Sequence, residues 1–198
     1  MKFIGYYNKT VWLSYFGMLS AITGIYYIRD LKISMICLII SGIADLFDGV
    51  IARKFKRTDS EKNFGIQLDS LVDTVSFLIF PAVFLLHALN SPFSIVIAAF
   101  YVFCGITRLA WFNITTYENN RVFHGIPVTY IALILPLFNL TALFGVSSFY
   151  EPALSALFII ISLLYIIDIK IKKPGGIAYI FFSLLAIAVA GLYLIIRY

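Results

Sequence analysis

The chain has 198 residues and a formal net charge of +5; 62% of its residues are hydrophobic and 13% are charged. Soluble domains average about 45–50% apolar and about 25% charged residues, so this composition argues against a water-soluble fold. The basic residues form no run with interleaved polar recognition residues, which argues against a nucleic-acid partner despite the positive charge. We expect a single integral membrane domain over residues 1–198, surrounded by membrane lipids.

Apolar windows of about 20 residues indicate membrane helices. Before the first window, Phe3, Ile4, Tyr6 and Tyr7 predict a short N-terminal segment that lies at the membrane interface. The windows follow in chain order at residues 11–28, 33–53, 69–90, 93–112, 126–146, 150–168 and 176–196. The sequence therefore predicts an all-α, polytopic bundle of about seven transmembrane helices.

The lysines and arginines are distributed unevenly among the connections between these windows. If the N-terminus is cytoplasmic, twelve of the 15 basic residues lie on the cytoplasmic side, and the other three are Arg29, Lys32 and Arg197. Cytoplasmic connections of membrane proteins carry the excess of basic residues. This pattern predicts a protein of the cytoplasmic membrane, with the segment RKFKRTDSEKNFG after the second window facing the cytoplasm.

Four of the ten acidic residues lie inside apolar windows, where charged side chains are costly and therefore indicate function. Asp45 and Asp48 are three positions apart in the second window, and Asp69 and Asp73 are four positions apart in the third. Each pair shares one face of a helix. Because a short connection joins the two windows, we expect antiparallel helices that bring the four carboxylates together near the cytoplasmic face.

Four adjacent carboxylates repel one another strongly in a low-dielectric site. Either some of them are protonated, or divalent cations neutralise them; pairing with Arg53 and Lys54 is a third, purely structural, interpretation. The spacing of the acids beside the small residues Gly49 and Ala52 favours a metal site. Ligands that offer only oxygen favour hard ions such as Mg²⁺, Mn²⁺ or Ca²⁺. Such a site beside basic residues suits a substrate that carries phosphate.

Two short motifs contain the four aspartates. The first runs from Asp45 to Arg53 and reads D-L-F-D-G-V-I-A-R; the second runs from Gly65 to Asp73 and reads G-I-Q-L-D-S-L-V-D. They resemble the signature of the CDP-alcohol phosphotransferase family, D-x-x-D-G-x-x-A-R and then G-x-x-x-D-x-x-x-D, with a spacer somewhat longer than the family commonly has. The resemblance implies a membrane enzyme with a six-helix family core plus one further helix, acting as a homodimer.

The resemblance also implies a role for each matching position. Asp45, Asp48 and Asp69 would bind one or two Mg²⁺ or Mn²⁺ ions, and Asp73 would bind a second ion or act as the general base. Small residues would leave room for the cytidine, and an arginine would contact an aspartate or the pyrophosphate. The residues implied in binding the nucleotide of the CDP-lipid are Asp48, Gly49, Ala52, Arg53, Gly65 and Asp69.

Three further segments extend the resemblance. LDSLVDTVSFLIFPAVFLL, TRLAWFNI and FHGIPVT are similar to the phosphatidylserine synthase branch of the family. Leu78 and Trp111 depart from that branch, which usually has a glycine and an arginine at these positions. The resemblance implies transfer of the phosphatidyl group of CDP-diacylglycerol to the hydroxyl of L-serine, giving phosphatidylserine and CMP.

A serine acceptor needs a cation for its carboxylate and a hydrogen-bond acceptor for its ammonium group. Arg108, at the cytoplasmic end of the fourth window, offers a bidentate donor for a carboxylate; capping its helix or contacting a lipid phosphate are the alternatives. Asn113 would add a hydrogen bond to the substrate or cap the same helix. Ser70, next to Asp69, is a third candidate for contact with the acceptor.

Two other functions fit parts of this pattern. The same chemistry with glycerol 3-phosphate or inositol phosphate would need several cations around the acceptor, and Arg108 and Arg121 supply some of them. A non-enzymatic cation-binding transporter would also use intramembrane aspartates. Such transporters often have repeated halves around a midplane site, and this sequence shows no internal repeat. We therefore expect serine transfer.

Overall fold

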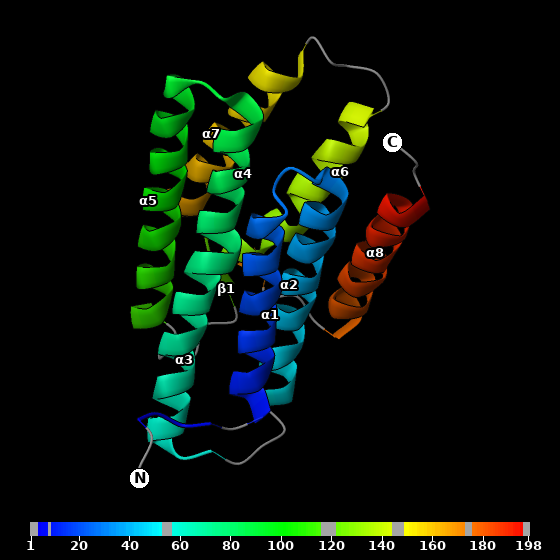
Figure 1. Ribbon diagram of the computed structural model, residues 1–198. Helices are drawn as coiled ribbons and strands as arrows, with labels where there is room; N and C mark the ends of the chain where they lie inside the picture. The colour runs from blue at the N-terminus through cyan, green and yellow to red at the C-terminus, as the bar shows by residue number, and fades with distance from the viewer. Residues whose placement is uncertain are drawn as a thin grey trace.

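The computed structural model describes residues 4–7, 9–52, 57–115, 122–143, 149–172 and 176–195. These residues form long helices and one small pair of strands (Figure 1). In chain order the elements are α1 (Lys9–Tyr26), α2 (Leu31–Ala52), α3 (Asp59–Asp73), the π-helix η1 (Thr74–Ile79), α4 (Phe80–Leu89), α5 (Pro92–Thr115), β1 (Val122–His124), the 3₁₀ helix η2 (Val128–Tyr130), α6 (Ile131–Leu143), α7 (Tyr150–Ile166), β2 (Lys170–Lys172) and α8 (Gly176–Ile195).

The predicted helical bundle is confirmed. Each of the seven predicted windows contains a helix, and α3, η1 and α4 form one continuous rod in the third. Helix α1 packs along α2, α5 packs along α7, and α2 also contacts α6 and α8. Figure 1 shows α8 at the edge of this bundle. The strands β1 and β2, which the sequence did not predict, pair antiparallel and join the segment before α6 to the segment after α7.

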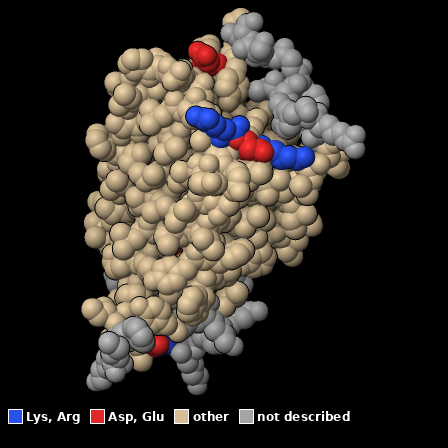
Figure 2. Space-filling model, in the orientation of Figure 1, with Lys and Arg blue, Asp and Glu red and all other residues tan. Residues whose placement is uncertain are grey.

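Two of the helical rods are long and apolar enough to cross a membrane, among the residues that the structure describes. They are Asp59–Leu89 and Pro92–Thr115, both with a mean hydropathy of 1.9. Four shorter apolar helices lie at Val11–Tyr26, Val128–Thr141, Tyr150–Ile166 and Ile180–Ile195. In Figure 2 charged side chains gather near the two ends of the molecule, and a broad uncharged belt lies between them. The arrangement suits a membrane protein, while seven spanning helices stay a prediction.

The N-terminal segment lies against the start of α3. The ring of Tyr6 packs edge-on to the ring of Phe64, with 5.7 Å between their centroids, and the hydroxyl of Tyr7 donates to the carbonyl of Ile4 at 2.9 Å. Ile4 itself is almost fully exposed. Exposed aromatic and aliphatic side chains suit a membrane interface, and that location stays a prediction. Phe3, which belongs to the same predicted segment, lies outside the described residues.

Helix α3 begins ten residues before the predicted window, which is a correction to the boundary drawn at residue 69. The polar residues there indicated a connection, but Thr58 and Glu61 form a capping box. The Thr58 hydroxyl accepts from the Glu61 N–H at 3.3 Å, and the Glu61 carboxylate accepts from the Thr58 N–H at 2.8 Å. These bonds satisfy N–H groups that a helix start leaves without partners. The capping box therefore fixes the first turn of α3, the helix whose Asp69 faces α2.

Replacing Thr58 by alanine is expected to lower the free energy of unfolding by about 1 kcal/mol, the usual cost of losing an N-cap hydroxyl. Denaturant titration of the purified protein in detergent measures this change. The matched control is Ser60→Ala, two residues further along the same exposed turn. An equal loss in both variants would show that the capping box contributes nothing special.

The π-helix η1 begins directly after Asp73 and interrupts the third rod. Pro81 follows it in the first turn of α4, and because proline has no N–H, the preceding turn loses a donor. The hydroxyl of Tyr101 in α5 donates to the carbonyl of Phe77 in that turn at 2.6 Å. Tyr101 is fully buried, and its hydroxyl also lies 3.2 Å from the hydroxyl of Tyr165 in α7. This contact joins three helices beside Asp73.

Candidate metal and nucleotide site

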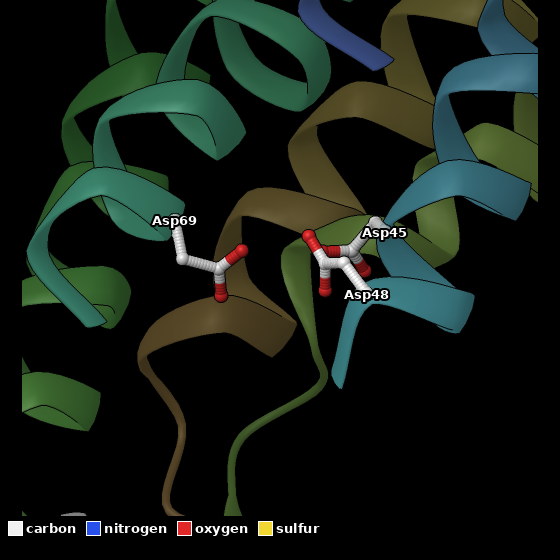
Figure 3. A group of neighbouring side chains, drawn as sticks. All are labelled: Asp45, Asp48 and Asp69. Atoms are coloured by element: carbon white, nitrogen blue, oxygen red, sulfur yellow. The ribbon is translucent and has the colours of Figure 1, made fainter. Parts of the chain in front are cut away.

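Three aspartates from α2 and α3 converge. Asp45, Asp48 and Asp69 each offer a carboxylate oxygen, and these oxygens all lie within 4.8 Å of one another. Figure 3 shows Asp69 pointing across from α3 toward the pair on α2. Asp48 is buried, and the other two are half-buried. The predicted convergence is confirmed for these three residues. We call them the three-carboxylate cluster.

Asp73 lies one helical turn beyond Asp69 and outside the three-carboxylate cluster. Its side chain makes a hydrogen-bond contact with the side chain of Asp45, and it is close enough to Asp48 and Asp69 for direct repulsion. Asp73 is 7% exposed, and one of its carboxyl oxygens has no partner among the described residues. The fourth predicted acid therefore adjoins the cluster through Asp45, and a metal bond to Asp73 stays a prediction.

Ser14 in α1 holds Asp48 in place. Its hydroxyl donates to Oδ2 of Asp48 at 2.7 Å, and the backbone of Gly49 also bonds to this carboxylate, so that both contacts orient it. A small cavity of about 10 Å³ lies between Ser14, Asp45 and Ser76, and the buried hydroxyl of Ser76 has no partner in the described part of the chain. Nothing in the sequence distinguished Ser14 from the other small residues of an apolar run, because its contact spans 34 positions.

Replacing Ser14 by alanine is expected to weaken Mn²⁺ binding by about 10-fold or more, as the loss of a group that orients a metal ligand usually does. Titration of the purified protein with Mn²⁺, followed by the paramagnetic signal of the free ion, measures the affinity. The control is Ser20→Ala on the same helix, since Ser20 donates to the Cys37 carbonyl at 2.9 Å, away from the acids. Unchanged Mn²⁺ affinity in Ser14→Ala would contradict the orienting role.

The two glycines of the motifs leave open space. A Cβ added to Gly49 would meet no atom within 4 Å, and one added to Gly65 would meet only Nη1 of Arg57, at 3.4 Å. Glycine inside a helix costs about 1 kcal/mol relative to alanine, and packing against the described residues does not require it at Gly49. The space suits an approaching ligand. The side chain of Ala52 is not described, and Arg53 lies outside the described residues.

Two of the predicted acceptor residues contact each other. The hydroxyl of Ser70 donates to Oδ1 of Asn113 at 2.9 Å, linking α3 to α5. Asn113 was expected beyond the end of the fourth helix, but α5 continues to Thr115, so Asn113 lies within it. This bond accounts for Ser70 and Asn113 structurally, and their contact with an acceptor stays a prediction.

Arg108, the third predicted acceptor residue, is buried. It is 6% exposed and lies close enough to the carboxyl group of Asp73 for direct electrostatic attraction, with the neutral phenol of Tyr165 nearby. Its guanidinium carbon lies 5.4 Å from the centre of the Phe112 ring, a cation–π contact. The side chain is therefore fixed beside the acids from the neighbouring helix α5.

The comparison with protein families decides the class. The sequence profile of CDP-alcohol phosphatidyltransferases matches residues 8–194, nearly the whole chain. The chain belongs to this family. A CDP-alcohol phosphatidyltransferase is an enzyme, and the resemblance of the two aspartate motifs is thereby confirmed. Family membership and the apolar helices together make this chain a membrane protein.

Several curated relatives of this CDP-alcohol phosphatidyltransferase carry names for serine transfer. A CDP-diacylglycerol–serine O-phosphatidyltransferase from Methanocaldococcus jannaschii is 38% identical over 90% of this chain and 83% of its own length. An archaetidylserine synthase from Methanothermobacter thermautotrophicus is 32% identical over 81% of this chain and 64% of its own. A CDP-diacylglycerol–serine O-phosphatidyltransferase from Bacillus subtilis is 32% identical over 66% of this chain and 68% of its own. The predicted branch of the family is confirmed.

Proposed function

We propose that this CDP-alcohol phosphatidyltransferase moves the phosphatidyl group of CDP-diacylglycerol to the hydroxyl of L-serine, giving phosphatidylserine and CMP. The observation that carries the chemistry is the three-carboxylate cluster of Asp45, Asp48 and Asp69. The choice of serine is supported by the names of the relatives, which include an enzyme that is similar over most of both chains. The protein would then act in phospholipid biosynthesis.

The donor set fits a divalent cation. The cluster offers oxygen ligands alone, which Mg²⁺ and Mn²⁺ prefer, and three close carboxylates need positive charge between them. We assign one or two such ions to Asp45, Asp48, Asp69 and Asp73; the unpartnered oxygen of Asp73 supports the fourth position. When bound, the cation supplies positive charge to phosphoryl oxygens.

Other residues of the chain bind the nucleotide and orient the CDP-lipid. The open space at Gly49 and Gly65 admits the cytidine, with Ala52 beside it, and Arg53 contacts the pyrophosphate or an aspartate. Asp48 and Asp69 flank the nucleotide. These contacts hold the CDP-lipid with its reacting phosphorus toward Asp73, so that the reaction begins from an oriented complex.

Asp73 is the proposed general base. It takes the proton of the serine hydroxyl, the serine oxygen forms a bond to the lipid-side phosphorus, and the bond from that phosphorus to the CMP oxygen breaks. CMP leaves with the electron pair. The buried position of Asp73, with a carboxyl oxygen that has no hydrogen-bond partner among the described residues, supports this assignment.

The cellular setting follows from the charge distribution and the family. The excess of basic residues in the predicted cytoplasmic connections supports a site that faces the cytoplasm, in the cytoplasmic membrane. We infer a single domain over residues 1–198, surrounded by membrane lipids, that acts as a homodimer without nucleic acid. The near-complete match to the family supports the single domain.

A panel of acceptors tests the proposal. Purified protein receives CDP-diacylglycerol, Mn²⁺ and one alcohol at a time: L-serine, glycerol 3-phosphate or inositol phosphate. Released CMP and the lipid product are measured. Serine should give CMP and phosphatidylserine, and the reaction without alcohol is the control. CMP release with a phosphorylated alcohol but not with serine would refute the serine assignment. No release with any alcohol, from CDP-diacylglycerol or from CDP-archaeol, would refute the transferase and favour a cation-binding protein. CDP-archaeol in parallel tests the lipid of the archaeal relative.

A further inference from the structure

A cavity lies between the ends of α5 and α7, apart from the three-carboxylate cluster. Its volume is about 340 Å³, within the range of about 300–1,000 Å³ that is usual for small-molecule sites. Its wall includes Thr107, Arg108 and Trp111 from α5, together with Tyr165 and Asp168 from the end of α7. The cavity therefore combines a cation, an anion and an aromatic ring. We call it the α5–α7 cavity.

Arg108 is built into the wall of this cavity. It is 94% buried, and its Nε has no hydrogen-bond partner in the described part of the chain. The Phe112 ring lies against the guanidinium and limits its orientations. A buried guanidinium without a full set of partners is costly, and a carboxylate supplies two parallel acceptors for it. The inner part of the cavity therefore suits a carboxylate.

Asp168 and Trp111 give the outer part of the cavity a different character. Both side chains are exposed, and both line the cavity. A carboxylate attracts an ammonium group, and an aromatic face adds to that attraction. An acceptor with a doubly charged phosphate would meet repulsion from Asp168, and Arg108 is the single cation among the described lining residues. The two ends together suit a small molecule that carries one charge of each sign.

The α5–α7 cavity adjoins the reaction site through Arg108, since Arg108 and Tyr165 both lie within electrostatic reach of Asp73. The turn before α6 packs against the same region. Gly125 has a φ of +73°, and a Cβ there would lie 2.7 Å from the Tyr165 carbonyl and 3.4 Å from Nε of Arg108. Only glycine allows this approach of the turn to the end of α7, because a Cβ would clash with the Tyr165 carbonyl. A ligand bound to Arg108 is thus held beside Asp73.

We infer that the α5–α7 cavity binds an α-amino acid zwitterion, with Arg108 holding its carboxylate and Asp168 its ammonium group. The inference rests on the proposed function, because this zwitterion is then the acceptor whose hydroxyl reacts. Asp168 becomes the residue that separates serine from acceptors without an ammonium group. Neither motif of the family signature includes it.

The test is Asp168→Asn, which keeps the shape of the side chain and removes its charge. The KM for L-serine should rise by about 10-fold or more, since a charge-assisted bond is lost, while the KM for CDP-diacylglycerol stays unchanged. 3-Hydroxypropionate lacks the ammonium group, so its use should not fall, and the preference for serine over it should shrink by the same factor. The control is Glu151→Gln, which removes an exposed acid at the other end of α7.

The outcomes are distinguishable. If the unmodified protein uses serine but Asp168→Asn leaves the serine KM and the preference unchanged, the cavity assignment is wrong and the proposed function stands. If the unmodified protein uses only a phosphorylated alcohol, both fail. Should Asp168→Asn not fold, Asp168→Glu retains the charge and should keep the preference, and calorimetric titration of the unmodified protein with L-serine and with 3-hydroxypropionate should show tighter binding of serine. Equal binding of the two would overturn the inference.

Discussion

Asp69→Asn should lose at least about 100-fold in CMP release, and its Mn²⁺ affinity should fall in parallel. Asp69 is the one member of the three-carboxylate cluster that α3 supplies, so its loss leaves only the two carboxylates of α2. A metal ion contributes several kcal/mol of charge stabilisation in phosphoryl transfer, and each 1.36 kcal/mol corresponds to a factor of about ten in rate. Steady-state CMP release and Mn²⁺ titration on the same preparation measure the two effects.

The control for Asp69→Asn is Asp59→Asn in the first turn of the same helix. The Asp59 side chain is 92% exposed and pairs with Lys62 at 2.9 Å. Because exposed ion pairs contribute little, this variant should retain activity within about twofold. Full activity in Asp69→Asn, with Mn²⁺ affinity unchanged, would mean that the cluster is not the metal site.

Asp73→Asn should separate binding from turnover. Asparagine fills the same space but cannot take a proton, and a positioned general base contributes about 10²–10⁴-fold to a rate. The variant should therefore bind CDP-diacylglycerol with near-normal affinity while kcat falls by that factor. Equilibrium binding of the CDP-lipid and single-turnover CMP release with serine measure the two quantities.

The metal content of Asp73→Asn decides between the two proposed roles of this residue. If Asp73 acts only as the base, Mn²⁺ binding stays close to normal; if it also binds an ion, the stoichiometry or the affinity drops. Unaltered CMP release would overturn the base assignment, and circular dichroism should confirm that the variant is folded. Ser14→Ala provides a useful comparison, because the Ser14 hydroxyl donates to Asp48.

Local spacing predicted much of the site. Asp45 and Asp48, three positions apart, share a helical face, and so do Asp69 and Asp73, four apart. A short connection between the two helices then left few ways to arrange the faces. Three of the four carboxylates meet as expected. The sequence also contained a signal for the start of α3, because Thr58 and Glu61 match the capping-box pattern. The polar residues around them favoured a connection instead, so the helix start was predicted too late.

Contacts between residues far apart in the chain could not be predicted from one sequence. Ser14 reaches Asp48 across 34 positions, and Ser70 reaches Asn113 across 43. A hydroxyl in an apolar run usually bonds to a carbonyl of its own helix, so neither serine signals a partner elsewhere. Asp168 likewise stands alone after the last apolar residues of its window, and only the fold places it in a cavity with Arg108.

The hydrogen bond between the Tyr101 hydroxyl and the Phe77 carbonyl links α5 to the third rod. Pro81 supplies no N–H to the third rod, and the Tyr101 hydroxyl from α5 donates to the Phe77 carbonyl in the preceding turn. Losing that hydroxyl would remove a buried hydrogen bond, at a cost of about 1 kcal/mol. Phenylalanine at position 101 would keep the aromatic ring but lose this bond to the third rod. The helical rod that carries Asp73 is thus held in part by a hydroxyl from another helix.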